Sequence, residues 1–413
     1  MKSIIFFLSL VTFAKINAQD YNKLSVLFLG NSYTYVNNLP QLIKDIALAN
    51  GDTLIFDSNC PGGQTFQGHF YDPTTVTKVT SKPWDYVVLQ AQSQEPSFSP
   101  AQVATQTLPY AIKLDSIIKH YNACSETVFY ETWGRKYGDA SNCPIYPPVC
   151  TYNGMQNRLR SSYKIFADTT HSVLSPVGEA FRKSINLNPT LELYSSDQSH
   201  PSIEGSYLAA CVFYEVLFHK SVLTNTYSAG ILPINETFLK QIAHTVVTDS
   251  LATWNIGKFS PYAPFGQTVI SALNYQFTSN TASLTNTWYF GDGGTSTTIN
   301  PTHTYSSIGT YTVSHVVYNS CASDSSTSVI NILSTNTIEK NNDFSIELYP
   351  NPANNTLYFT ENSNYIIYDV FGKLCLMGSD IKANISSLPN GVYFIDLKLN
   401  GVTKKVKFLK QSQ

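Results

Sequence analysis

The feature that most constrains the fold is the stretch LSVLFLGNSYTYVNN, residues 24–38. Its first part, Leu24 to Leu29, is an apolar run, interrupted only by Ser25, that stops at a glycine. Such a run predicts a strand buried on both faces, as in parallel sheets covered by helices. Ser32 then falls at the carboxyl end of the strand, the edge where open α/β sheets bind ligands. Ser32 is therefore a candidate nucleophile, and the alternative is that it only caps the next helix.

A second stretch, YSSDQSHPSIEGSYLAA, holds two residues that suit a nucleophilic serine. Asp197 and His200 lie three residues apart, just before apolar residues that recur at helical spacing from Ile203. A serine needs an adjacent base, and the base needs a third group that fixes its tautomer and stabilises the imidazolium. The pair therefore predicts a base and its orienting carboxylate. The alternative is a helix-capping aspartate beside a surface histidine.

Together these motifs resemble the SGNH/GDSL hydrolases, over about residues 24 to 220. The matching elements are Gly-Asn-Ser at 30–32, Asp-x-x-His at 197–200, and the Pro-Ser, Gly and Tyr-Leu-Ala that follow. The resemblance implies a flavodoxin-like three-layer α/β sandwich. It also implies carboxylic ester hydrolysis without a cofactor, in which Ser32, His200 and Asp197 are catalytic.

Ester hydrolysis also needs hydrogen-bond donors for the oxyanion that develops on the carbonyl. The backbone amide of Ser32 is one candidate. The sequence CPGGQ offers Gly62 or Gly63 as a second, because glycine lets the backbone approach a ligand closely. Of these two we assign Gly63.

The third donor is expected at the end of the predicted strand DYVVLQ. The family usually has Gly-x-Asn-Asp there, whereas this chain has LQAQSQEPS, with Gln90, Gln92 and Gln94 as candidates. We favour Gln90 because it directly ends the strand. Trp133 and Arg135, in ETWGRKY after another predicted strand, are expected to line the substrate site, and core packing is the alternative for Trp133.

The remaining pattern up to Trp254 alternates between strands and helices, which predicts a parallel sheet with helices on both faces. Strands are expected at 24–29, 54–56, 86–89, 127–130 and 172–174. Helices are expected at about 40–51, before Pro83, at 99–121, at 155–166, from Ile203, and at 236–254.

Residues 1–18 predict a secretory signal peptide, with a lysine, an apolar core and a small residue at the expected cleavage site. The core is too short for a membrane span, and we expect no other transmembrane segment. The net charge of −2 argues against a nucleic-acid partner.

The seven cysteines are an odd number, so at least one is expected to stay outside intramolecular disulfides. Cys143 and Cys150 bracket a short proline-rich loop, and export favours a disulfide between them. Cys60 and Cys124 pair only if the fold brings them together. No cysteine or histidine spacing indicates a metal site.

Beyond the α/β domain, expected over residues 19–258, FSPYAPFG at 259–266 predicts a linker. Short alternating segments at 267–335 predict a β-sandwich. WYFGDG at 288–293 and the residues 303–313 resemble a PKD domain, in which Asp292 is a turn residue.

After a second linker at 336–343, residues 344–413 predict a compact antiparallel domain. YPNP at 349–352, GVY at 391–393 and the terminal lysines resemble the sorting domain of type IX secretion cargo. This resemblance implies recognition by the type IX secretion machinery and export across the outer membrane, to a secreted or cell-surface location.

The sequence thus predicts an exported serine esterase, with acylated polysaccharide suggested as substrate by analogy alone. Two alternatives stay open. One is a glycan-binding or adhesin protein with a decayed site, and the other is an acyltransferase that uses the same residues.

Overall fold

The structure is a computed structural model that describes residues 22–279, 284–332, 347–369, 374–399 and 402–411. The predicted signal peptide and the predicted linker at 336–343 lie outside these residues. The chain divides into two compact units, residues 1–333 and residues 334–413. None of the described helices is long and apolar enough to cross a membrane.

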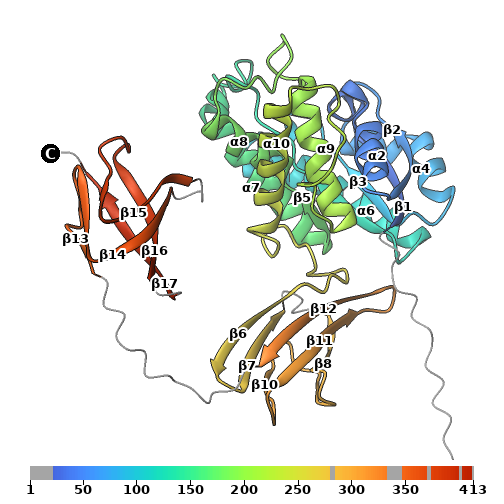
Figure 1. Cartoon of the computed structure of the whole chain (residues 1–413). Helices are drawn as coiled ribbons and strands as arrows, with labels where there is room; N and C mark the ends of the chain where they lie inside the picture. The colour runs from blue at the N-terminus through green and yellow to red at the C-terminus, as the bar shows by residue number, and fades with distance from the viewer. Residues whose placement is uncertain (1–21, 280–283, 333–346, 370–373, 400–401, 412–413) are drawn as a thin grey trace, which may run out of the picture. The chain divides into compact units, whose positions relative to one another are not determined.

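The first unit is built on a five-stranded parallel sheet with the order β2-β1-β3-β4-β5 (Figure 1). This is the flavodoxin-like order, so the fold prediction is confirmed. The strands are β1 (Lys23–Leu29), β2 (Thr53–Asn59), β3 (Tyr86–Leu89), β4 (Glu126–Tyr130) and β5 (Val173–Ser175). The central strand β3 is buried throughout, as its continuous apolar sequence predicts.

Helices cover both faces of this sheet (Figure 1). On one face α2 (Leu39–Ala49), α8 (Val177–Leu187) and α10 (Pro233–Thr248) pack against α9 (Ile203–Phe218). The other layer contains α3 (Phe66–Tyr71), α4 (Pro73–Thr80), α6 (Leu108–Tyr121) and α7 (Tyr152–Thr170). The short α1 (Ser32–Tyr35) follows β1 directly.

Two helices differ from the sequence prediction. The helix expected over 99–121 begins as α5 (Pro100–Gln102) and passes through a π-helical turn, Val103–Thr107, before α6. Pro109 explains the interruption, since it has no N–H for the helical ladder and its ring crowds the preceding turn. The sequence reading also missed α8.

The rest of the first unit is a β-sandwich of two antiparallel sheets, with orders β10-β7-β6 and β12-β11-β8-β9. Its core contains Phe277, Trp288, Tyr305 and Val313. The strands are β6 (Phe265–Ser271), β7 (Asn274–Ser279), β8 (Thr285–Tyr289), β9 (Thr295–Ser296), β10 (Thr302–Thr304), β11 (Gly309–Tyr318) and β12 (Ser323–Ile332).

The segment predicted as a linker at 259–266 is packed rather than loose. Ser260 and Ala263 are buried, and the ring of Tyr262 lies 4.1 Å from that of His219 at the end of α9. The amide of Ala263 donates to Asp324 Oδ2 over 2.8 Å. The segment therefore belongs to the packed interior between the α/β layers and the sandwich.

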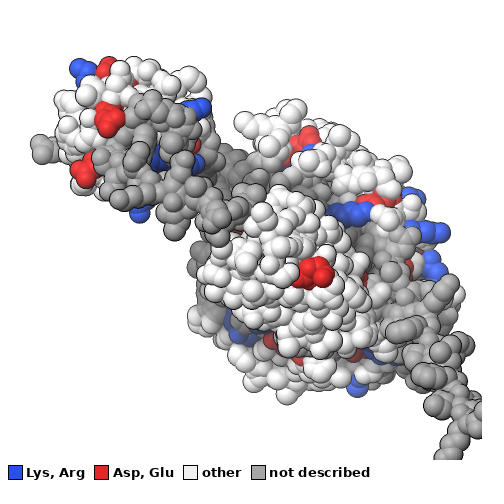
Figure 2. Space-filling model, turned by 60° about the horizontal axis from the view of Figure 1, so that its bottom comes forward, with Lys and Arg blue, Asp and Glu red and all other residues white. Residues whose placement is uncertain are grey.

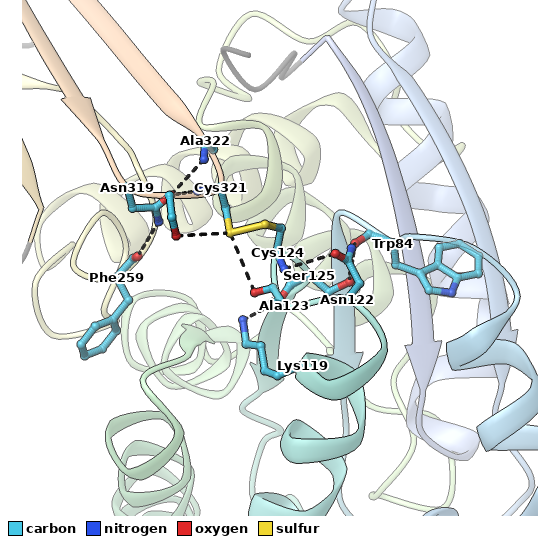
Figure 3. The surroundings of a disulfide bond; sticks show 11 residues. Trp84, Lys119, Asn122, Ala123, Cys124, Ser125, Phe259, Asn319, Cys321 and Ala322 are labelled. Carbon is cyan, nitrogen blue, oxygen red and sulfur yellow. Dashed lines mark hydrogen bonds between the residues drawn. A yellow bond between two sulfur atoms is a disulfide. The ribbon is translucent and has the colours of Figure 1, made fainter. Parts of the chain in front are cut away.

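A disulfide joins Cys124, just before β4, to Cys321 in the turn between β11 and β12 (Figure 3). Beside it, the Asn319 side chain accepts hydrogen bonds from the amides of Cys321 and Ala322 and donates to the Phe259 carbonyl. Cys60 is not the partner of Cys124. The predicted disulfide between Cys143 and Cys150 is confirmed.

The described strands of the second unit pair antiparallel, as predicted, and an isolated parallel bridge joins Ala353 to Lys410. Leu357, Phe359, Ile395 and Phe408 lie in its core. Its strands are β13 (Leu348–Tyr349), β14 (Thr356–Asp369), β15 (Leu374–Asn384), β16 (Gly391–Leu399) and β17 (Val402–Lys410).

Charged side chains are sparse on the face drawn in Figure 2, where both signs are scattered among uncharged residues. This distribution agrees with a charged fraction of only 13% in the whole chain.

Candidate active site

The turn that presents Ser32 lies at the carboxyl end of β1. Ser32 is the first residue of α1, and Asn31 caps the helix by accepting a hydrogen bond from the amide of Tyr33 over 3.2 Å. Gly30 is required before them, because a Cβ there would lie only 2.7 Å from Gln90 Oε1. We call residues 30–32 the nucleophile turn.

The structure brings the three predicted catalytic residues together although they are far apart in sequence. Ser32 Oγ lies 2.8 Å from His200 Nε2, and His200 Nδ1 contacts Asp197 Oδ2. The carboxylate therefore sets the tautomer with hydrogen on Nδ1, which leaves Nε2 to accept the Ser32 proton. This is the arrangement that a serine nucleophile needs.

Asp197 is held by the backbone of its own loop as well as by His200. Its Oδ1 accepts the amides of Ser199 over 3.0 Å and of His200 over 2.9 Å. Partial burial opposes ionisation, but these hydrogen bonds and the His200 contact outweigh it and lower the Asp197 pKa below its usual value. Asp197 is therefore a carboxylate at neutral pH.

The site is open to solvent. The side chains of Asp197 and His200 are 48% and 32% exposed. Both belong to the short loop between α8 and α9, residues 195–200, which we call the Asp-His loop. The bridge between Tyr194 and Pro201 closes the loop at its base.

Trp133 supports the Asp-His loop from below and does not line the substrate site, which corrects the expectation from sequence. It is fully buried, with ring stacks on Tyr33 at 4.9 Å and on Phe181 at 4.1 Å. Its indole N–H donates to the Ser199 carbonyl over 3.0 Å. A side chain enclosed in this way has no surface left for substrate.

Arg135 is partly accessible, in contrast to Trp133. Its side chain is 29% exposed, and one terminal nitrogen lies 3.6 Å from Asp139 Oδ1. The next amide, of Lys136, donates to the carbonyl of Gln198 in the Asp-His loop over 3.0 Å. Arg135 therefore lies in a segment that supports the loop, and a contact with substrate remains a proposal.

Gln90 is placed differently from the sequence expectation of an oxyanion donor. It is fully buried, and its Nε2 donates to Asn31 Oδ1 and to the Ala91 carbonyl. Its Oε1 accepts the Asn31 amide over 2.9 Å and the Thr34 hydroxyl over 3.0 Å. Both amide hydrogens are engaged, so Gln90 holds the nucleophile turn and is not aimed at a ligand.

The neighbouring glutamines have different partners. Gln92 Oε1 accepts the amide of Gln94 over 2.7 Å, and Gln94 Nε2 donates to Asp139 Oδ2 over 2.7 Å. Asp139 lies just before the loop closed by the Cys143–Cys150 disulfide and is bonded to it, because its amide donates to the Val149 carbonyl and its carbonyl accepts the Cys143 amide. Gln94 therefore fastens this disulfide loop to the end of β3.

Gly63 lies in an exposed turn after β2 with φ +69°, a conformation that favours glycine. The next residue, Gln64, uses its carbonyl to accept Asn31 Nδ2 over 2.9 Å. This contact connects the glycine turn to the nucleophile turn, so Gly63 belongs to the same edge of the sheet as Ser32.

The sequence did not indicate a role for Tyr33, Phe181 or His69. Tyr33 and Phe181 stack on Trp133, and His69 contacts the Gly30 carbonyl of the nucleophile turn. The hydroxyl of Tyr33 lies 2.6 Å from Ser199 Oγ, and its ring meets that of His200 edge-on at 5.3 Å. The only available signal for Tyr33 was its place next to Ser32. Among the described residues, no group of three His, Cys, Asp or Glu is arranged to hold a metal ion.

Comparison with known families identifies the two regions after the α/β layers. Residues 262–333 match the family model of the PKD domain, and residues 347–411 match that of the secretion system C-terminal sorting domain. The chain carries a PKD domain and a sorting domain. The sorting domain indicates export across the outer membrane to a secreted or cell-surface location.

Several solved structures are similar to parts of the chain. A DUF4886 family protein from Bacteroides uniformis is 19% identical, covering 55% of this chain and 96% of its own, with a TM-score of 0.48. A putative GDSL-like lipase from Parabacteroides merdae is 16% identical, covering 49% and 98%, with a TM-score of 0.35. The PKD1 domain of the Vibrio cholerae metalloprotease PrtV is 30% identical, covering 18% and 96%, with a TM-score of 0.16. No curated protein matches the chain.

Proposed function

We propose that the protein is an exported serine esterase of the SGNH type that hydrolyses carboxylic esters. One observation carries the proposal, the continuous hydrogen-bonded chain from Ser32 through His200 to Asp197. These three residues lie at the carboxyl edge of a flavodoxin-like sheet, where the loops that bind ligands converge.

In the acylation step, Ser32 Oγ attacks the ester carbonyl carbon while His200 Nε2 takes the hydroxyl proton. The imidazolium that forms is stabilised by Asp197, whose lowered pKa keeps it ionised. The tetrahedral intermediate then collapses, the bond to the alkoxy oxygen breaks, and His200 returns the proton to the leaving alcohol. Water, deprotonated by His200, hydrolyses the acyl-enzyme in the second half of the cycle.

The oxyanion of each tetrahedral intermediate needs donors that are already in place. We assign the backbone amides of Ser32 and Gly63 to this role. The hydrogen bond between Asn31 and the Gln64 carbonyl supports the assignment, because it keeps the two turns adjacent. Gln90 contributes indirectly, by holding the peptide that precedes Ser32.

The exposure of the triad favours a short acyl group on a bulky alcohol, with acylated polysaccharide as the leading substrate class. Side chains that are 48% and 32% exposed leave room for a polymer to pass over the site. Export places the enzyme where such polymers occur. Arg135 is the side chain assigned to contact the alcohol part, because it retains exposed surface near the Asp-His loop.

The test is covalent labelling with a fluorophosphonate probe, followed by hydrolysis of aryl acetate, longer aryl esters and acetylated glycans. We expect the probe to label Ser32 and the acetyl substrates to be cleaved fastest. Ser32→Ala should remove labelling and lower turnover by roughly a thousandfold or more, while the melting temperature stays close to that of the wild type.

Unchanged turnover in Ser32→Ala would remove this serine from the mechanism. A folded wild-type protein that neither reacts with the probe nor cleaves any ester would favour the glycan-binding alternative. Acyl transfer to an added sugar in preference to water would favour the transferase.

A further inference from the structure

His69 is a buried histidine that lies outside the triad and contacts the nucleophile turn. It belongs to α3 and is fully buried. Its Nε2 lies 2.9 Å from the carbonyl oxygen of Gly30, two residues before Ser32. A carbonyl only accepts, so Nε2 must carry the hydrogen.

The other ring nitrogen has a partner that suits this tautomer. His69 Nδ1 lies 3.0 Å from Thr75 Oγ1, which also accepts a hydrogen bond from Asn59 Nδ2 over 3.0 Å. Because Asn59 donates to the hydroxyl, the hydroxyl proton is available for Nδ1. Asn59 is itself fixed by Asp72 Oδ2 at 2.7 Å. Hydrogen bonds therefore run in one direction, from Asn59 to Thr75, from Thr75 to His69, and from His69 to the Gly30 carbonyl.

The Gly30 carbonyl and the Asn31 amide belong to one planar peptide group. His69 binds the oxygen of this group, and Gln90 Oε1 accepts its N–H over 2.9 Å. Two buried side chains, one from α3 and one from the end of β3, therefore hold the oxygen and the N–H of this peptide. Its rotation would move Asn31 and, with it, the start of α1 at Ser32.

We propose that His69 is a positioning residue that fixes the Ser32 nucleophile by clamping the Gly30–Asn31 peptide together with Gln90. The proposal rests on the esterase function proposed above. Misplacing a nucleophile by about 1 Å costs of the order of a hundredfold in rate, so the clamp acts on turnover more than on substrate binding.

The donation from Thr75 needs a neutral ring, since the Nδ1 of an imidazolium has no lone pair left to accept the hydroxyl proton. Burial lowers the His69 pKa, against the opposing effects of the Gly30 contact and the charge of Asp72. The neutral form with hydrogen on Nε2 is thus the form present where an esterase operates.

Two conservative variants separate the clamp from simple packing. Glutamine places its amide nitrogen near the position of Nε2, so His69→Gln keeps a donor for Gly30. Asparagine reaches only as far as Nδ1, where its amide oxygen accepts the Thr75 hydroxyl proton, so His69→Asn keeps the contact with Thr75 and loses the one with Gly30. With an aryl ester as substrate, we expect His69→Asn to lower kcat roughly a hundredfold with little change in KM. The kcat of His69→Gln should stay within about tenfold of the wild-type value.

Equal kcat values in the two variants, at comparable melting temperatures, would overturn the proposal. A second measurement does not depend on turnover: the ¹⁵N spectrum of the His69 ring, assigned by its loss in His69→Gln. Hydrogen on Nε2 between pH 6 and pH 8 supports the clamp, and a neutral ring with its hydrogen on Nδ1 overturns it. An inactive wild type with the expected tautomer would reject the esterase function and leave the clamp in place.

Discussion

Trp133 donates its indole N–H to the Ser199 carbonyl over 3.0 Å, and this bond joins the end of β4 to the loop that carries Asp197 and His200. The loop is short and exposed, and Gln198 within it has φ +60°. Lys136 adds a second bond from the same segment to Gln198. His200, the proposed base, therefore owes its position to the buried aromatic rings that pack against the loop.

Removing the Trp133 bond should lower turnover without unfolding the protein. Trp133→Phe keeps an aromatic ring between Tyr33 and Phe181 but leaves the Ser199 carbonyl without this donor. We expect kcat to fall roughly tenfold and the free energy of unfolding to fall by about 1 kcal/mol. Kinetics with an aryl ester and chemical denaturation measure the two effects.

Trp84→Phe is the matched control. Trp84 is also buried, and its indole N–H donates to the Lys78 carbonyl over 2.8 Å, close to the amino end of β3. We expect a similar loss of stability and an unchanged kcat. An equal fall in kcat in the two variants would show that Trp133 acts only through global stability.

The parts of the site that the sequence predicted are those encoded by local pattern. An apolar run ending in Gly-Asn-Ser defines β1 and Ser32, and Asp-x-x-His before a helical pattern defines the base and its carboxylate. For Trp133 the structure agrees with the alternative of core packing, and it places Gln90 behind the nucleophile turn; neither position follows from local pattern, since the partners come from segments distant in sequence. Whether a side chain faces substrate or packs beneath a loop depends on these tertiary contacts, which periodicity does not report.

Gln90 should affect stability and turnover together, unlike an exposed oxyanion donor. Gln90→Ala removes four hydrogen bonds and leaves a cavity beside Gly30, so we expect kcat to fall roughly a hundredfold and stability to fall by about 2 to 4 kcal/mol. Thermal melting and steady-state kinetics on the same preparation check this. Gln92→Ala is the control, with small effects on both. A large loss of kcat in Gln90→Ala at wild-type stability would instead restore the role of direct donor.

The two disulfides should separate stability from catalysis. Cys124 precedes β4, at the opposite end of the parallel sheet from the triad. Replacing Cys124 and Cys321 by serine should lower the melting temperature while kcat stays near wild type, since a disulfide typically contributes about 2 to 4 kcal/mol.

Replacing Cys143 and Cys150 by serine should lower kcat, because their loop is hydrogen-bonded to Asp139, the partner of Gln94 at the carboxyl edge. Melting curves and kinetics of both double variants make the comparison. A loss of activity confined to the Cys124 and Cys321 variant would mean that the PKD domain helps to form the site.

The last prediction concerns pH and the contact between the α/β layers and the packed segment at 259–263. Glu126 begins β4, and burial raises its pKa to about 7, although Lys119 and a hydrogen bond with Ser260 oppose the shift and Asp115 adds to it. A carboxyl whose pKa is higher in the folded state binds its proton more tightly there. Its contribution to stability is therefore complete below the unfolded pKa and is lost as pH rises through about 7.

We expect the free energy of unfolding of the wild type to fall between pH 5 and pH 8, by at most about 3 kcal/mol from this group. Glu126→Gln should flatten that part of the profile, since an amide keeps the shape of the protonated acid and does not ionise. Denaturant unfolding at half-unit pH steps measures both slopes, and parallel slopes for wild type and variant would place the titration elsewhere.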